Sequence, residues 1–208
     1  MDTGFLITAF VTLVVIIDPV GMTPLFVALT QGMTNARRRA IALRACITSA
    51  LILVVFAAFG EAVLGFIGIS MPAFRIAGGI LLFLTALDML FERRKQRRES
   101  QSEASVLDPA DDPSVFPLAM PLISGPGAMA TMILLMGGAD EVVGKLAIVG
   151  VMVAGLVCVF AFFLAAGALG RYLKDTGINV VTRLLGMLLA ALAIQFMIDG
   201  LAQTGLFG

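Results

Sequence analysis

The chain has 208 residues, of which 60% are hydrophobic and only 13% are charged, whereas about a quarter are charged in an ordinary soluble domain. This composition excludes a soluble globular domain and predicts a protein that crosses a membrane several times. Histidine is absent, and no basic face interleaved with aromatic residues suggests nucleic-acid binding. Cys46 and Cys158 lie within apolar runs, where buried packing is favoured over a disulfide or a reactive thiol.

Six apolar segments reach the length of about 20 residues that a membrane span requires. We expect spans at 3–30, 41–68, 72–91, 115–137, 145–170 and 178–203. No basic residue precedes the first segment, no small-residue cleavage site follows it, and Asp18 interrupts it. We therefore expect this segment to remain as a span rather than to be cleaved as a signal peptide. The predicted fold is an all-α integral membrane protein with six transmembrane helices.

Clusters of helix-breaking residues interrupt the first and fourth of these segments. Residues 18–24 read DPVGMTP, and residues 121–127 read PLISGPG. Proline lacks a backbone N–H, and the carbonyls that it leaves free must find a partner other than lipid. Paired interruptions at corresponding places in two halves indicate the substrate site of a transporter. The sequence thus predicts that helices one and four are broken near the middle of the membrane.

Short patterns recur in the same order in the two halves of the chain. An Ile-x-x-x-Gly pattern begins at 17 and 123, a Phe-x-x-x-Gly pattern at 56 and 163, and an Arg-x-x-Gly pattern at 75 and 183. Because each half holds three spans, an odd number, the second repeat must be inverted relative to the first. We expect one three-helix repeat at 1–91, a polar cytoplasmic connector at 92–114 and the second repeat at 115–208.

The basic residues predict the orientation in the membrane. With these spans, 12 of the 14 basic residues fall on one side, and only Arg75 and Lys145 fall on the other. The basic side is expected to be cytoplasmic, so both termini should lie outside. The connector begins with a basic run that fixes topology and touches anionic lipid; the alternative is a docking site for a regulator.

The first break offers the polar groups that a small zwitterion needs. The half-helix that enters the break presents carbonyls, and the one that leaves it presents N–H groups. Thr23-Pro24 reads as the N-cap and first residue of the second half-helix, and the second cluster offers an inverted copy. We predict a substrate site formed by Asp18, Gly21, Thr23, Ser124, Gly125 and Gly127.

Asp18 is the only carboxylate near the centre of a predicted span. A buried charge requires a partner, so Asp18 is a candidate to bind a coupling cation, to hold the ammonium group of a substrate or to cycle a proton. The alternative is that it caps the half-helix starting at Pro19, and both roles are compatible. Ser124 occupies the matching position in the second half, which indicates one asymmetric site rather than two equivalent ones.

Several polar residues lie toward the ends of spans. Interfacial anchoring, capping or solvation is the simplest role for each. The alternative is a gate, with Arg75 paired to an acidic residue, Glu61 or Asp88. The candidates for a gate or for a supporting position near the site are Glu61, Arg75, Asp88 and Gln195.

Four motifs resemble those of the MarC family of inner-membrane proteins. They are Asp18-Pro-Val-Gly-x-x-Pro, Arg75-Ile-Ala-Gly-Gly, Pro121-Leu-Ile-Ser-Gly-Pro-Gly, and Arg183-Leu-Leu-Gly followed by Gln195. The resemblance covers nearly the whole chain, with 92–113 the least typical part. It implies a multi-pass protein of a bacterial inner membrane and, for some members, transport of small neutral amino acids such as glycine and alanine.

We therefore expect a secondary transporter of small neutral amino acids, coupled to H⁺ or Na⁺, that needs no cofactor. The chain contains no Gly-x-x-x-x-Gly-Lys-Ser/Thr loop for ATP. The alternatives are an exporter or channel for another small polar solute, or a non-transporting assembly or sensor protein. We do not expect an enzyme, because a hydrolase based on Ser124 would lack its histidine base. The expected partners are a neutral amino acid and the lipid bilayer, and a homo-oligomer is left open.

Overall fold

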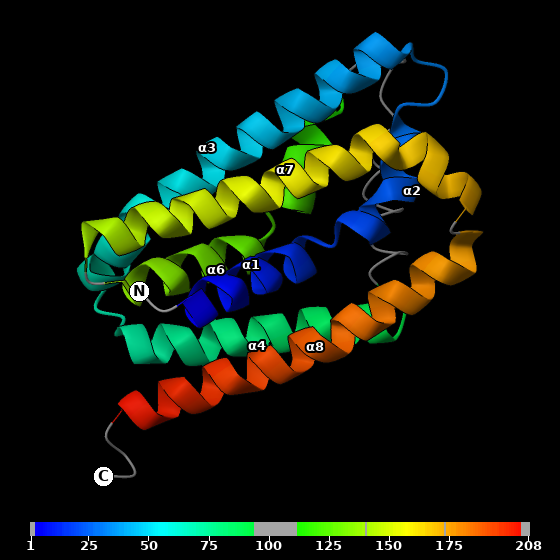
Figure 1. Cartoon of the computed structure of the whole chain (residues 1–208). Helices are drawn as coiled ribbons and strands as arrows, with labels where there is room; N and C mark the ends of the chain where they lie inside the picture. The colour runs from blue at the N-terminus through cyan, green and yellow to red at the C-terminus, as the bar shows by residue number, and fades with distance from the viewer. Residues whose placement is uncertain (1–2, 94–111, 140, 173, 205–208) are drawn as a thin grey trace.

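The computed structural model describes residues 3–93, 112–139, 141–172 and 174–204, and within these ranges every regular element is a helix (Figure 1). The first half contains α1 (Thr3–Ile17), α2 (Pro19–Leu29), α3 (Asn35–Ile67) and α4 (Met71–Leu90). The second half contains η1 (Ser114–Ile123), α6 (Pro126–Gly137), α7 (Val142–Tyr172) and α8 (Lys174–Gln203). Each half thus has two short elements followed by two long helices.

The lengths and composition of these helices suit a membrane. Five segments are long and apolar enough to cross it: Thr3–Leu29, Asn35–Ile67, Met71–Leu90, Val142–Gly167 and Thr176–Gln203. The elements η1 and α6, bent by 58°, make a sixth if they count as one broken span. Large apolar side chains cover the outside; Phe66, for example, is 94% exposed. Such a surface fits lipid rather than water, and the prediction of an all-helical membrane protein is confirmed for the part that the structure describes.

The junction between α1 and α2 lies at Asp18. This residue has φ 58° and ψ 67°, a left-handed conformation that is uncommon for residues other than glycine. One prediction about the junction is wrong, because Thr23 and Pro24 lie inside α2 and do not begin it. Asp18 supplies the cap and Pro19 the first residue of the helix, so α2 begins earlier than predicted.

The element η1 is not the regular helix predicted for the first part of 115–137. Phe116 and Met120 have extended backbone conformations, and the peptide bonds from Phe116 to Pro117 and from Met120 to Pro121 are cis. Both prolines lack the N–H that an α-helical ladder requires. Regular α-helix is restored only in α6, so the irregular region is longer than the sequence predicted.

The two halves meet most extensively where α4 packs antiparallel to α8. A Cβ atom added to Gly79 of α4 would lie 2.8 Å from the carbonyl oxygen of Ala193, and one added to Gly186 of α8 would lie 3.3 Å from that of Ala86. The same offset relates these two contacts, since 186 − 79 and 193 − 86 are both 107. Small residues thus let the two backbones approach closely at two equivalent places.

We predict that Gly79→Ala destabilises the protein by about 1–3 kcal/mol, because the added methyl group presses on backbone and the helices must separate. Gly65→Ala is the matched control, since a Cβ on this glycine of α3 would meet nothing within 4 Å. It should be neutral or slightly stabilising, because alanine is the better helix former. Thermal unfolding of both variants in detergent checks this, and equal midpoints would contradict the packing.

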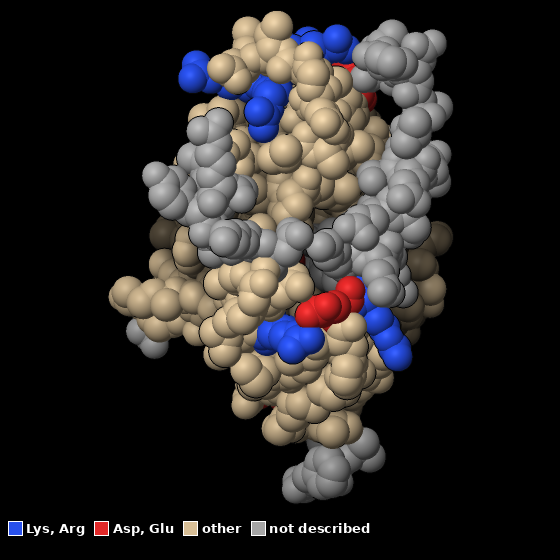
Figure 2. Space-filling view, turned by 90° about the vertical axis from the view of Figure 1, so that its right-hand side faces the viewer, with Lys and Arg blue, Asp and Glu red and all other residues tan. Residues whose placement is uncertain are grey.

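At one end of the bundle, α3 and α8 begin and α4 ends (Figure 1). Figure 2 shows basic and acidic side chains together on this face. Arg44 of α3 donates to Asp112 just before η1 at 2.5 Å, and Arg183 of α8 donates to Glu92 just after α4 at 2.7 Å. Both ion pairs join the first half of the chain to the second. Residues 94–111, most of the predicted connector, lie outside the described part.

Candidate functional site

Asp18 folds back over the first turn of α2. Its carboxylate Oδ1 accepts a hydrogen bond from the N–H of Gly21 at 3.0 Å, and the residue is only 1% exposed. A Cβ atom on residue 21 would collide with this carboxylate, so glycine is required here. The geometry is that of an N-cap, and the negative charge lies at the partially positive end of a helix.

Each of the two half-helices α2 and α6 carries a buried threonine near its start. Thr23 donates its hydroxyl to the carbonyl of Pro19 at 2.9 Å, and Thr131 donates to that of Gly127 at 2.8 Å. Both side chains are fully enclosed. The Thr23 hydroxyl donates to its own helix and retains only its capacity as an acceptor.

The second cluster is held against α3. Ser124 is completely buried, and its hydroxyl donates to the carbonyl of Ser49 in the middle of α3 at 3.3 Å. The next residue, Gly125, is the N-cap of α6. A Cβ atom there would lie 2.7 Å from the carbonyl oxygen of Pro121, so only glycine fits this turn of the backbone.

The start of α6 differs from that of α2 because no side chain caps it in the described structure. Pro126 at the first helical position has no N–H, and the N–H groups of Gly127 and Ala128 have no acceptor within the helix. Both residues are buried. A buried helix start without a side-chain cap offers N–H groups and a positive dipole end to an anion.

The structure places the start of α6 against the last turn of α1, which leads into the first cluster. A Cβ atom added to Gly127 would lie 3.4 Å from Cγ2 of Ile16, in the last turn of α1, and 3.5 Å from Cδ2 of Leu82 in α4. The start of α6 therefore packs beside the residues that lead into Asp18. Apolar residues from both breaks, including Ile17 and Ile123, belong to one continuous buried core.

Comparison with known proteins decides the family. The profile described as "MarC family integral membrane protein" matches residues 3–204, which include both breaks. The chain belongs to the MarC family. The motifs recognised in the sequence are thus confirmed as those of a MarC protein over nearly its whole length.

Relatives of this MarC protein occur in both archaea and bacteria. It is 38% identical over 203 residues to the "UPF0056 membrane protein" of Archaeoglobus fulgidus, covering 96% of this chain and 93% of the relative. It is 34% identical over 210 residues to the "UPF0056 membrane protein YvbG" of Bacillus subtilis, covering 97% of this chain and 96% of the relative. It is 33% identical over 196 residues to the "UPF0056 inner membrane protein YhgN" of Escherichia coli K12, covering 94% of this chain and 95% of the relative. No solved structure matches.

The structure separates the predicted gate residues of this MarC protein. Glu61 is exposed on α3, Arg75 and Asp88 are half-buried on α4, and Gln195 is exposed on α8. The Nε of Arg75 is buried and has no hydrogen-bond partner, and Arg75 forms no ion pair with any described residue. The suggested pairing of Arg75 with Glu61 or Asp88 is therefore not formed. Gln195 instead donates its amide to Asp199 at 2.8 Å.

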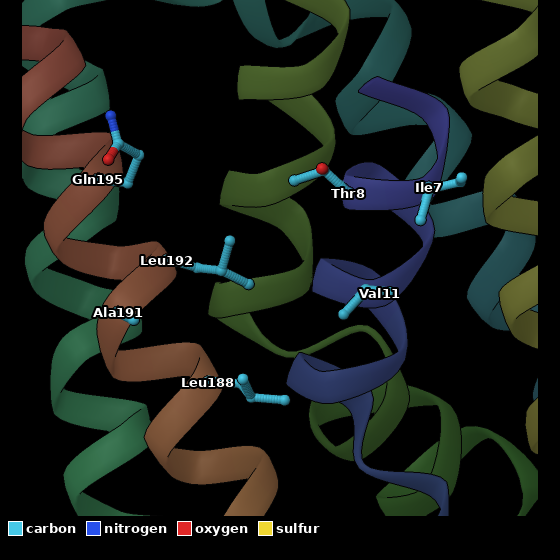
Figure 3. Close-up of a pocket in the computed structure, with 7 residues that line it drawn as sticks. All are labelled: Ile7, Thr8, Val11, Leu188, Ala191, Leu192 and Gln195. Atoms are coloured by element: carbon cyan, nitrogen blue, oxygen red, sulfur yellow. The ribbon is translucent and has the colours of Figure 1, made fainter. Parts of the chain in front are cut away.

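A cavity of about 410 Å³ lies between α1 and α8, away from the two breaks. Figure 3 shows Leu188 and Leu192 pointing from α8 toward α1, and Thr8 pointing from α1 toward α8. The lining is mostly apolar, and the Thr8 hydroxyl already donates to the carbonyl of Gly4. This lining suits hydrocarbon better than a zwitterion. The full lining comprises Ile7, Thr8, Val11, Leu188, Ala191, Leu192 and Gln195.

Ser49 is the residue near the site that reasoning from the sequence missed. Its carbonyl accepts from Ser124, and its own hydroxyl is buried without a partner among the described residues. An unsatisfied buried hydroxyl is costly. A polar Thr48-Ser49 pair in the middle of an otherwise apolar span was the available signal.

Proposed function

We propose that this MarC protein is a secondary transporter of small neutral amino acids, which bind between the breaks at 18–24 and 121–127. The observation that carries the proposal is the uncapped start of α6 beside the end of α1, where Gly127 and Ala128 are buried and Pro126 is exposed. The carboxylate of a zwitterion would accept hydrogen bonds from Gly127 and Ala128. Its ammonium group would bind the Asp18 carboxylate, at the junction that follows the last turn of α1.

The surroundings of this site favour a small substrate. Ile16 and Leu82 lie within ordinary van der Waals distance of a Cβ atom added at Gly127, so apolar side chains enclose the start of α6, which would suit a substrate with a small side chain. The unpartnered hydroxyl of Ser49, whose carbonyl contacts Ser124, is a further donor for the substrate carboxylate. Asp18 is the proposed site of coupling to H⁺ or Na⁺.

Two inverted repeats are the proposed architecture behind this site. Equivalent helices make equivalent contacts: α2 packs on α7 as α6 packs on α3. The Gly79–Ala193 and Gly186–Ala86 contacts have the same relation. The basic end shown in Figure 2 would face the cytoplasm, with both termini outside. Such a pair of repeats can open the site to each side in turn.

Thermal unfolding of the purified protein with a panel of amino acids tests the proposal. Glycine, alanine and serine should raise the midpoint, since a ligand at 100 times its Kd stabilises by about 2.7 kcal/mol. Glutamate and lysine should have no effect, and runs with and without Na⁺ would identify the coupling ion. If no amino acid raises the midpoint, the proposed substrate class is wrong. Counterflow in proteoliposomes would then separate a carrier from a channel, because only a carrier exchanges substrate across the membrane.

Ser49→Ala tests, in the same measurement, whether the Ser49 hydroxyl takes part in binding. Removing an unpartnered buried hydroxyl should leave the free protein as stable as before or more so, because no hydrogen bond is lost. The concentration of glycine needed for a given shift should nevertheless rise by about tenfold, the effect of losing about 1.4 kcal/mol of binding. An unchanged glycine response would remove Ser49 from the site.

A further inference from the structure

The ion pair at the basic end has a counterpart in the other repeat. Arg183, in the N-terminal half of α8, donates to Glu92 at 2.7 Å and joins this helix to the residues just after α4. Arg183 corresponds to Arg75 at an offset of 108, and Asp199 corresponds to Glu92 at 107, the offset of the glycine contacts, so the two pairs occupy equivalent places to within one residue. The counterparts carry the same charges and lie at the opposite ends of the same two helices.

The counterparts lie on adjoining turns but do not pair. A Cβ atom on Gly200, next to Asp199, would lie 2.8 Å from Cγ1 of Ile76, next to Arg75. The turns of α4 and α8 that carry the two charges are therefore in contact. Yet the Nε of Arg75 has no hydrogen-bond partner among the described residues, and Asp199 accepts from Gln195 instead. One end of the α4–α8 contact is joined by an ion pair, and the other is not.

The cavity between α1 and α8 lies beside the middle of the α4–α8 contact. Its lining on α8 runs from Leu188 to Gln195, the residue that donates to Asp199 (Figure 3). At the basic end, two ion pairs join the halves. Among the described residues, the two ends of the α4–α8 contact therefore differ in their ion pairs and not in how closely the helices pack.

We propose that Arg183–Glu92 and Arg75–Asp199 are alternating gates, of which the first is closed in this structure and the second closes in the opposite state. The inference rests on the proposed transport function. When the repeats exchange conformations, Asp199 would leave the Gln195 amide for the Arg75 guanidinium, and Glu92 would release Arg183. One charge-assisted hydrogen bond replaces another, so the two states have similar free energies and a small substrate can shift the balance.

Crosslinking in native membranes tests the gates without any substrate. In a chain with Cys46→Ala and Cys158→Ala, the pair Arg75→Cys and Asp199→Cys is treated with a short bifunctional thiol reagent. Adding Glu92→Gln, which opens the first gate, should raise the crosslinked fraction about fivefold at low conversion, a coupling of about 1 kcal/mol. Glu141→Gln, at the exposed carboxylate that precedes α7, is the control and should change nothing. A yield that does not respond to Glu92→Gln, or no crosslink in any variant, would overturn the proposal.

Charge reversal in transport provides the second readout. Arg75→Asp and Asp199→Arg should each lower glycine exchange about fivefold or more, and the double reversal should recover most of it. Failure of the double variant to recover exchange would count against the gate. If crosslinking responds as expected but no amino acid is exchanged, the gates stand and the proposed substrate class fails. If glycine is exchanged but crosslinking does not respond, only the gates fail.

Discussion

Asp18→Asn will strongly reduce glycine transport while leaving folded protein in the membrane. Asparagine keeps a side-chain oxygen that can accept from the N–H of Gly21, so the cap of α2 is retained. It loses the negative charge that would bind the ammonium group and the coupling cation. Because hydrogen bonds to charged groups contribute about 1.5–3 kcal/mol, exchange should fall about 10- to 100-fold. Counterflow in proteoliposomes with matched protein content measures this.

Two further variants separate transport from capping. Asp18→Ala removes both charge and cap, and should also lower stability by about 1 kcal/mol. Asp112→Asn removes a carboxylate that pairs with Arg44 at the exposed basic end, and should leave transport near the native rate. Native exchange by Asp18→Asn would mean that Asp18 only caps α2 and takes no part in the mechanism.

Gly125→Ala has the second-largest expected effect. The added Cβ would lie 2.7 Å from the carbonyl oxygen of Pro121, and a backbone atom cannot rotate away as a side chain can. The turn between η1 and α6 must open, which would cost about 1–3 kcal/mol and displace the N–H groups of Gly127 and Ala128. We expect both a lower unfolding midpoint and a loss of at least about tenfold in glycine exchange.

Gly150→Ala is the matched control for this change. Gly150 lies in α7, and a Cβ atom there would meet nothing within 4 Å. Transport and stability should therefore remain near native, with a slight gain from helix propensity. Equal behaviour of Gly125→Ala and Gly150→Ala would show that the tight turn at Gly125 is not needed for the site.

The spans were predictable because length and hydropathy alone define them: a run of about 20 apolar residues has few alternatives to crossing a bilayer. The position of the first junction was harder. Asp18-Pro19 and Thr23-Pro24 are both a capping residue followed by proline, and nothing local decides between them. The left-handed conformation of Asp18 depends on the carboxylate reaching the Gly21 N–H.

Long-range contacts account for what the sequence could not predict. Pro117 and Pro121 indicated an interruption, and the extended conformations of Phe116 and Met120 have a local cause, because a residue before proline is disfavoured in the α region; the contacts between distant residues had no such local signal. The Ser49 contact joins residues 75 positions apart, and the Arg183–Glu92 pair joins residues 91 apart. The repeat offset relates Glu92 to Asp199 in the sequence. Which of these two carboxylates pairs with an arginine, however, depends on the conformation of the whole bundle.

An experimentally determined structure of the purified protein with saturating glycine tests the central claim most directly. We expect the ligand between the two breaks, with its carboxylate on the N–H groups of Gly127 and Ala128 and its ammonium on Asp18. Two results would contradict it. One is glycine bound elsewhere, for example in the cavity between α1 and α8; the other is no glycine at the two breaks and an unchanged Asp18 cap.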